Sequence, residues 1–242
     1  MPNQPISMAD MIAPLAVFDL DGTLVDTAPD LVATLNTIFA REGLPPVAYE
    51  AARNMVGGGA RALIERGLRA DGRALTGEQV DHLVKDFIAH YAEHIADQSR
   101  PFPGLTAALD SLEAGGCRLA VCTNKLEWLS VRLLDRLGLS ARFVAICGSD
   151  TFGLQKPNPE LLRRTIARCG GAGDHAVMIG DSISDIAMAR SAGVPVVGVA
   201  YGYTETPVAQ LCPDRVIGAL SELPQAVFDL MEAGGALRAE QG

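Results

Sequence analysis

Short apolar runs alternate with helical patterns along most of the chain. Six runs predict β-strands: Leu15–Asp19, Arg118–Thr123, Phe143–Cys147, Ala176–Asp181, Val194–Ala200 and Arg215–Ile217. Most of these runs are nearly continuous rather than alternating, which is typical of strands that are covered on both faces. The segments between them place leucines at helical spacing, as at Leu126, Leu129 and Leu133, and end at glycines. This alternation predicts an α/β fold with a doubly wound parallel sheet and right-handed crossovers.

One stretch, residues 28–97, interrupts the alternation. It contains no convincing strand, and apolar residues at helical spacing predict amphipathic helices around residues 31–39 and 80–95. We therefore expect an α/β core formed by residues 1–27 and 98–242, with a helical insert of about 70 residues after its first strand. The polar, proline-containing segment that follows the insert is typical of a hinge.

Composition and charge exclude several classes of protein. The net charge of -9 and the pI of about 4.9 disfavour contact with a nucleic-acid backbone. The five cysteines include no Cys-x-x-Cys, which favours a reducing compartment over a disulfide framework. No run approaches the ~20 apolar residues of a membrane helix, and residues 1–14 lack the features of a signal peptide. We expect a cytoplasmic monomer or homodimer that binds neither nucleic acid nor membrane.

Two carboxylates close the first predicted strand. Asp19 and Asp21 stand two residues apart, so an extended chain points both side chains to the same side. Repulsion and desolvation oppose the placement of two like charges in one small volume. A divalent cation, together with a division of chemical labour between the two carboxylates, would account for the pair.

Polar residues also follow the other predicted strands. Thr123 and Asn124 follow the second run, Lys156 lies in a loop after the third, and Asp181 and Asp185 follow the fourth. Because the carboxyl ends of parallel strands meet at one edge of a sheet, these side chains should converge. Carboxylates suit Mg²⁺, and a lysine suits a phosphoryl group. The set therefore predicts phosphoryl transfer. The chain has no Walker loop and no Gly-x-Ser-x-Gly elbow, so the nucleophile must be water or a carboxylate.

These residues form four motifs, in order across nearly the whole chain. The motifs are Asp19-Leu20-Asp21-Gly22-Thr23, Thr123-Asn124, Lys156-Pro157 and Gly180-Asp181-Ser182-Ile183-Ser184-Asp185. They resemble the motifs of phosphatases in the haloacid dehalogenase-like superfamily. The resemblance implies a Rossmann-like core with an inserted all-helical cap, which closes on the site and excludes water.

The resemblance also implies a role for each core residue. Asp19 is the nucleophile and forms an aspartyl-phosphate. Asp21 is the general acid that protonates the leaving oxygen, and then the base that activates water. Thr123 holds the phosphoryl group together with the backbone amide of Asn124. Lys156 screens the phosphoryl charge against Asp19.

A Mg²⁺ cofactor follows from the same resemblance. Asp181 binds the ion together with Asp19 and the main-chain carbonyl of Asp21. Asp185 orients the metal site from behind these ligands. Ser182 and Asp185 also fit a helix-capping box, so this pair has a structural interpretation as well.

A glycine-rich segment of the insert is the candidate for recognition of the leaving group. Gly57, Gly58 and Gly59 precede a helical pattern, so exposed amides and a helix N-terminus could face an anion. Arg61 could pair with a carboxylate. A flexible turn is the alternative interpretation. The segment, and Tyr201-Gly202-Tyr203 after the fifth strand, are similar to those of phosphoglycolate phosphatases, which implies hydrolysis of 2-phosphoglycolate to glycolate.

Other functions remain open from the sequence. The core motifs handle only the phosphate, so a phosphatase or mutase acting on a sugar phosphate or a nucleotide monophosphate is possible. A non-catalytic domain that binds phosphorylated ligands or partners is an alternative of a different class. Such a domain should have lost Asp19, Asp21 or Lys156, and all three are present.

Overall fold

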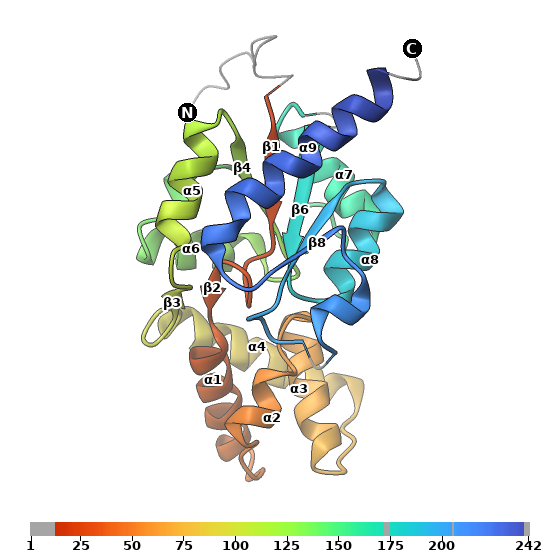
Figure 1. Ribbon diagram of the computed structural model, residues 1–242. Coiled ribbons are helices and arrows are strands. Elements are labelled where there is room, and N and C mark those ends of the chain that lie inside the picture. The colour runs from red at the N-terminus through yellow and green to blue at the C-terminus, as the bar shows by residue number, and fades with distance from the viewer. Residues whose placement is uncertain (1–12, 172–174, 205, 240–242) are drawn as a thin grey trace.

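The computed structural model describes residues 13–171, 175–204 and 206–239. Residues 1–12, most of the segment in which no signal peptide is expected, lie outside the described residues. The described residues form a central sheet with helices on both faces, and a separate group of helices beyond one end of the sheet (Figure 1).

The central sheet has six strands, and all neighbouring strands are parallel. In spatial order they are β5 (Phe143–Cys147), β4 (Arg118–Cys122), β1 (Leu15–Phe18), β6 (Ala176–Gly180), β7 (Val196–Val199) and β8 (Arg215–Ile217). All six predicted strands are present, and the predicted α/β class is confirmed. Four strands end one residue earlier than predicted, so Asp19, Thr123, Asp181 and Ala200 are the first residues beyond them, and β7 also begins two residues later than predicted.

The two faces of the sheet are covered by different helices. One face packs against α5 (Leu105–Ala114), α6 (Glu127–Arg136) and α9 (Leu223–Ala239), and the other against α7 (Pro159–Arg168) and α8 (Ile183–Ala192). Within β1, Ala16 and Phe18 face the first group, whereas Leu15 and Val17 face the second. Both faces of the strand are therefore buried, which explains its continuous apolar sequence. Short 3₁₀ helices lie in the connections at Ser140–Arg142, Val208–Leu211 and Leu220–Glu222.

Residues 28–97, all of which the structure describes, contain helices and no strand. The helices are α1 (Ala28–Arg41), α2 (Tyr49–Arg53), α3 (Gly59–Ala70) and α4 (Gly77–Glu93). Helix α4 packs against both α1 and α3, and α2 packs against α1. Helix α4 begins with a capping box in which the Thr76 side chain accepts from the backbone of Gln79 and the Gln79 side chain accepts from Thr76. The group lies beyond the end of the sheet to which β1 and β6 point (Figure 1).

The chain enters and leaves this helical group through a pair of short strands that sequence analysis did not predict. Strand β2 (Val25–Asp26) pairs antiparallel with β3 (Arg100–Pro101). Asp30, in the first turn of α1, accepts hydrogen bonds from the backbone N–H (2.8 Å) and the hydroxyl (2.6 Å) of Ser99. The two connections are therefore joined to each other rather than running separately.

Candidate active site

The ends of the central strands bring the predicted polar residues to one edge of the sheet. Asp19 and Asp21 follow β1, Thr123 and Asn124 follow β4, and Asp181 follows β6. These carboxyl-terminal ends face the helical group (Figure 1). The convergence that the parallel topology predicts is therefore present.

Lys156 joins the first strand to a distant loop. Its Nζ lies 2.7 Å from Oδ1 of Asp19 and 2.7 Å from Oδ1 of Asp185, and all three side chains are buried. Burial lowers the pKa of Lys156, but the carboxylates of Asp185 and Asp19 outweigh burial and the pKa is raised overall. The lysine therefore stays positively charged beside Asp19.

Three buried carboxylates form a cluster that suits a divalent cation. Among the described residues, Asp19, Asp181 and Asp185 offer oxygens that all lie within 4.8 Å of one another. Burial raises the pKa of Asp19, Lys156 lowers it, and Asp185 and Asp181 raise it, which together give a pKa of about 8. Burial and Asp185 raise the pKa of Asp181 to about 6. Ionisation of these carboxyl groups is therefore unfavourable without a further positive charge, and their hard oxygen donors fit a divalent metal ion.

The structure does not place the Asp21 carboxylate in this cluster. Its predicted contact with the metal runs through the main-chain carbonyl, and it stays a prediction. Asp185 belongs to the cluster, although the sequence predicts that it only orients the metal site. The Asp185 carboxylate also accepts from Ser182, from the backbone N–H at 3.1 Å and the hydroxyl at 2.6 Å, at the start of α8. The capping interpretation is thus confirmed beside the contact with Lys156.

Asp181 is fixed by its surroundings on several sides. The Thr23 hydroxyl donates to Oδ1 at 3.0 Å, and the Tyr203 N–H donates to Oδ2 at 2.8 Å. A Cβ at Gly202 would lie 2.2 Å from the Cβ of Asp181, and one at Gly22 would lie 2.6 Å from Oδ2. Glycine at these two positions lets the backbone approach the carboxylate closely.

Asp21 has a buried partner that sequence analysis missed. The Thr27 hydroxyl donates to Asp21 Oδ1 at 2.7 Å, and Nζ of Lys125 lies 3.0 Å from the same oxygen. Lys125 also donates to the hydroxyl of Tyr91 on α4 at 3.2 Å, and its Nζ lies 4.6 Å from the centre of the Tyr91 ring. The available signal was that Lys125 is one of three lysines and directly follows Thr123 and Asn124.

Asn124 connects the core to the helical group. Its Oδ1 accepts from the Lys156 backbone N–H at 2.8 Å, and its Nδ2 donates to the Gly57 carbonyl at 3.2 Å. The adjacent Thr123 is buried, and its hydroxyl accepts from the Lys125 backbone N–H at 3.3 Å. Both residues lie beside the site as predicted, and their contacts with a phosphoryl group stay predictions.

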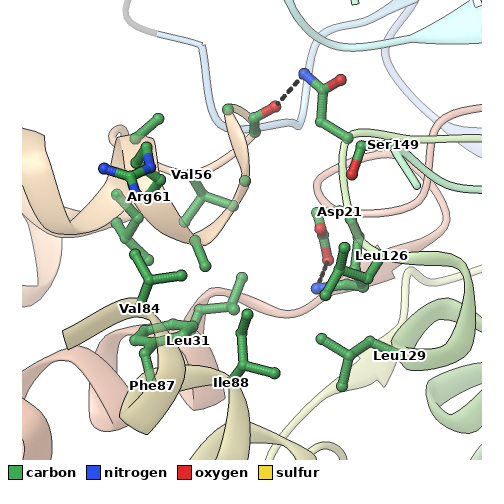
Figure 2. Close-up of a pocket in the computed structure, with 18 of the residues that line it drawn as sticks. Asp21, Leu31, Val56, Arg61, Val84, Phe87, Ile88, Leu126, Leu129 and Ser149 are labelled. Carbon is green, nitrogen blue, oxygen red and sulfur yellow. Dashed lines mark hydrogen bonds and ion pairs between the residues drawn. The ribbon is translucent and has the colours of Figure 1, made fainter. Parts of the chain in front are cut away.

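A cavity of about 280 Å³ lies between the core edge and the helical group. Most of the labelled side chains around it in Figure 2 are apolar: Leu31, Val56, Val84, Phe87, Ile88, Leu126 and Leu129. Asp21 lies on one side of the cavity and Arg61 on the other. The cavity therefore joins the predicted acid to the predicted recognition segment through a largely apolar space.

The predicted recognition residues all line this cavity. They are Gly57, Gly58, Gly59 and Arg61. Arg61 forms ion pairs with Glu65 (3.4 Å) and Asp81, and about half of its side chain is exposed. Its role in binding a substrate carboxylate stays a prediction.

Comparison with known proteins identifies the family. The model of the haloacid dehalogenase-like hydrolases matches residues 16–199. The chain belongs to this family. It is 46% identical over 228 residues to a phosphoglycolate phosphatase of Agrobacterium fabrum (94% of this chain, 98% of the relative). It is 48% identical over 225 residues to one of Caulobacter vibrioides (93% and 95%).

A crystal structure of a "predicted phosphoglycolate phosphatase" from Haemophilus somnus aligns with a TM-score of 0.82 and 30% identity, over 91% of this chain and 99% of that one. The fold and hydrolase family expected from the sequence motifs are therefore confirmed. Among the described residues, no helix is both long and apolar enough to span a membrane.

Proposed function

We propose that the protein is a Mg²⁺-dependent phosphatase of the cytoplasm that hydrolyses 2-phosphoglycolate to glycolate and phosphate. The observation that carries this proposal is the position of the Lys156 ammonium, 2.7 Å from Asp19 and 2.7 Å from Asp185, beside the carboxylate of Asp181. A carboxylate nucleophile, a fixed cation and a site for a divalent ion are the parts that phosphoryl transfer needs.

In the proposed mechanism, an oxygen of Asp19 attacks phosphorus and forms an aspartyl-phosphate. Lys156 neutralises charge on the phosphoryl oxygens, and the Thr123 hydroxyl and the Asn124 backbone N–H donate to them. Mg²⁺, held by Asp19, Asp181 and the main-chain carbonyl of Asp21, would supply further positive charge for the phosphoryl group.

Asp21 moves the protons in both half-reactions. It protonates the leaving oxygen as glycolate departs, and then takes a proton from the water that hydrolyses the aspartyl-phosphate. Thr27 and Lys125 both contact its Oδ1, which orients the carboxyl group. Because Asp21 also lines the cavity, the leaving group would occupy that cavity.

We also propose that residues 28–97 act as a cap on a core of residues 1–27 and 98–242. The cap would open to admit the ester and close to exclude water during transfer. The contact from Asn124 Nδ2 to the Gly57 carbonyl supports this role, because it joins the two parts at the site.

The proposed substrate rests on relatives and on the cavity. Two relatives named phosphoglycolate phosphatase each match more than nine-tenths of the chain. The apolar walls offer few partners for the hydroxyls of a sugar, and an unpaired buried polar group is costly. The alternative nevertheless has a relative of its own, because an N-acetylmuramic acid 6-phosphate phosphatase of Pseudomonas aeruginosa is 37% identical over 77% of the chain.

A panel of phosphate esters tests the substrate. We expect kcat/KM with Mg²⁺ to be higher for 2-phosphoglycolate than for hexose phosphates, nucleoside monophosphates and N-acetylmuramic acid 6-phosphate. A preference of about tenfold or more for another ester, which corresponds to about 1.4 kcal/mol, would overturn the proposed substrate.

An aryl phosphate separates an enzyme from a non-catalytic binder. We expect phosphate release by the wild-type protein that is lost in Asp19→Asn and kept in Lys85→Met, because Lys85 is exposed on α4. The absence of release from any ester would favour the binder.

A further inference from the structure

Lys125 is a buried cation on the cavity wall whose role in the proposed phosphoryl chemistry is limited to orienting Asp21. It lines the cavity beside Asp21, and its side chain is 6% exposed. The neighbouring Asp21 carboxylate, 3.0 Å from its Nζ, favours the charged form of the lysine. The cavity therefore contains an ammonium group within hydrogen-bond distance of the proposed general acid.

The contacts of Lys125 leave part of its donor capacity for a ligand. An ammonium group has three N–H donors. Asp21 Oδ1 at 3.0 Å and the Tyr91 hydroxyl at 3.2 Å account for two of them. One donor remains for a group that enters the cavity.

Arg61 and Lys125, the two cations on the cavity wall, differ in how many carboxylates already pair with them. Arg61 lies across the cavity from Asp21 (Figure 2), and Glu65 and Asp81 both pair with its half-exposed guanidinium. Lys125 has one carboxylate partner, Asp21, and it is surrounded by largely apolar walls. An anion beside Lys125 would therefore be attracted in a medium of low dielectric constant, where charge-assisted hydrogen bonds are strong.

The chemistry of the proposed substrate places its second anion near this lysine. Asp21 must contact the leaving oxygen in order to protonate it. In 2-phosphoglycolate a single methylene separates that oxygen from the carboxylate. The carboxylate is thus held close to Asp21, and Lys125 lies 3.0 Å from Asp21.

We propose that Lys125 binds the carboxylate of the leaving group and so sets a preference for acidic phosphate esters. This inference rests on the proposed function, because it assumes that the leaving oxygen meets Asp21. It differs from the sequence-based prediction, which gives the carboxylate to Arg61. It also differs from a role in which Lys125 only orients Asp21.

The experiment compares 2-phosphoglycolate with ethyl phosphate, an ester of similar size without the carboxylate. Both kcat and KM are measured for the wild type, Lys125→Gln, Lys125→Met and the exposed-lysine control Lys85→Met. Glutamine keeps a hydrogen-bond donor in the buried site, so Lys125→Gln tests the charge even if Lys125→Met fails to fold. Thermal melts establish which variants are folded.

We expect the ratio of kcat/KM for the two esters to fall about tenfold to a hundredfold in the Lys125 variants. The selective part of the loss should appear in KM for 2-phosphoglycolate, whereas any misorientation of Asp21 lowers kcat for both esters. Lys85→Met should keep the wild-type ratio.

Two results would overturn the Lys125 site alone. In the first, the wild type prefers 2-phosphoglycolate, but kcat/KM falls by the same factor for both esters in the Lys125 variants. The other is a selective loss in Arg61→Ala that is absent from Lys125→Gln. A wild-type protein without any preference for 2-phosphoglycolate over ethyl phosphate would instead remove the proposed substrate, and the Lys125 site with it.

Discussion

The charged groups on the core side of the site and those on the cap side differ in how firmly they are held. On the core side, which we call the core wall, Asp19, Lys156 and Asp181 are buried, and neighbouring side chains and backbone groups hold them. On the cap side, which we call the cap wall, Arg61 is about half exposed and pairs with Glu65 and Asp81. The core residues act on the phosphate group that all phosphate esters share. The cap residues face the leaving group, so substrate preference can vary through changes on the cap side.

The largest effect should come from removing the cation of the core wall. Lys156→Met leaves Asp19 and Asp185 buried without their ammonium partner, which costs about 3–5 kcal/mol of unfolding free energy. We expect kcat/KM for an aryl phosphate to fall about 10³-fold. Urea unfolding and steady-state assays measure the two effects, with Lys85→Met as the control. Wild-type stability in Lys156→Met would refute the view that the core wall depends on this charge.

A smaller loss of activity should follow from a substitution that displaces the Asp181 carboxylate but keeps the residue itself. A Cβ at Gly202 would lie 2.2 Å from the Cβ of Asp181, so Gly202→Ala must displace one of the two segments. We expect kcat/KM to fall about 10²-fold, as for other small displacements of catalytic groups. Gly77→Ala is the matched control, because a Cβ there meets nothing within 4 Å. Full activity in Gly202→Ala would mean that the position of Asp181 is not critical.

Metal removal should make the core wall sensitive to pH. Folding raises the pKa of Asp19 to about 8 and that of Asp181 to about 6, from an ordinary value of 3.8. The folded state then binds protons more tightly, so this contribution to stability is present at low pH and falls as pH rises from about 4 through 8.

A bound cation offsets the ionised carboxylates. Calorimetry should therefore show that Mg²⁺, compared with EDTA, raises Tm more at about pH 8 than at about pH 5. An equal rise at both pH values would contradict the view that the bound cation offsets ionised carboxylates.

The smallest effect should come from the contact that joins the two walls. Tyr91→Phe removes the hydroxyl 3.2 Å from Lys125 and keeps the aromatic ring beside the ammonium. We expect a loss of about 1 kcal/mol in stability and a roughly fivefold lower kcat/KM. The measurement is the same ester pair used for Lys125. A loss as large as that of Lys156→Met would show that the cap wall is held as firmly as the core wall.

The sequence predicted the sheet and the core motifs because both depend on local patterns. Apolar runs specify buried strands, and parallel topology then brings Asp19, Lys156 and Asp181 together. The contacts of Asn124 with Gly57 and of Lys125 with Tyr91 depend on how the cap docks on the core. No local pattern specifies that docking, so these contacts were not predicted. The pairing of β2 with β3 was missed for a different reason, because each strand has only two residues and so carries no recognisable pattern.

The pairing of β2 with β3 also bears on how proteins of this architecture can diversify. Val25 lies opposite Pro101, so the two points where the chain crosses between core and cap are neighbours. The inserted helices between β2 and β3 can therefore be replaced by a different insert without any change in the order of the sheet strands or in the positions of the core carboxylates. The part that selects the leaving group can thus change while the residues that react with the phosphate stay the same.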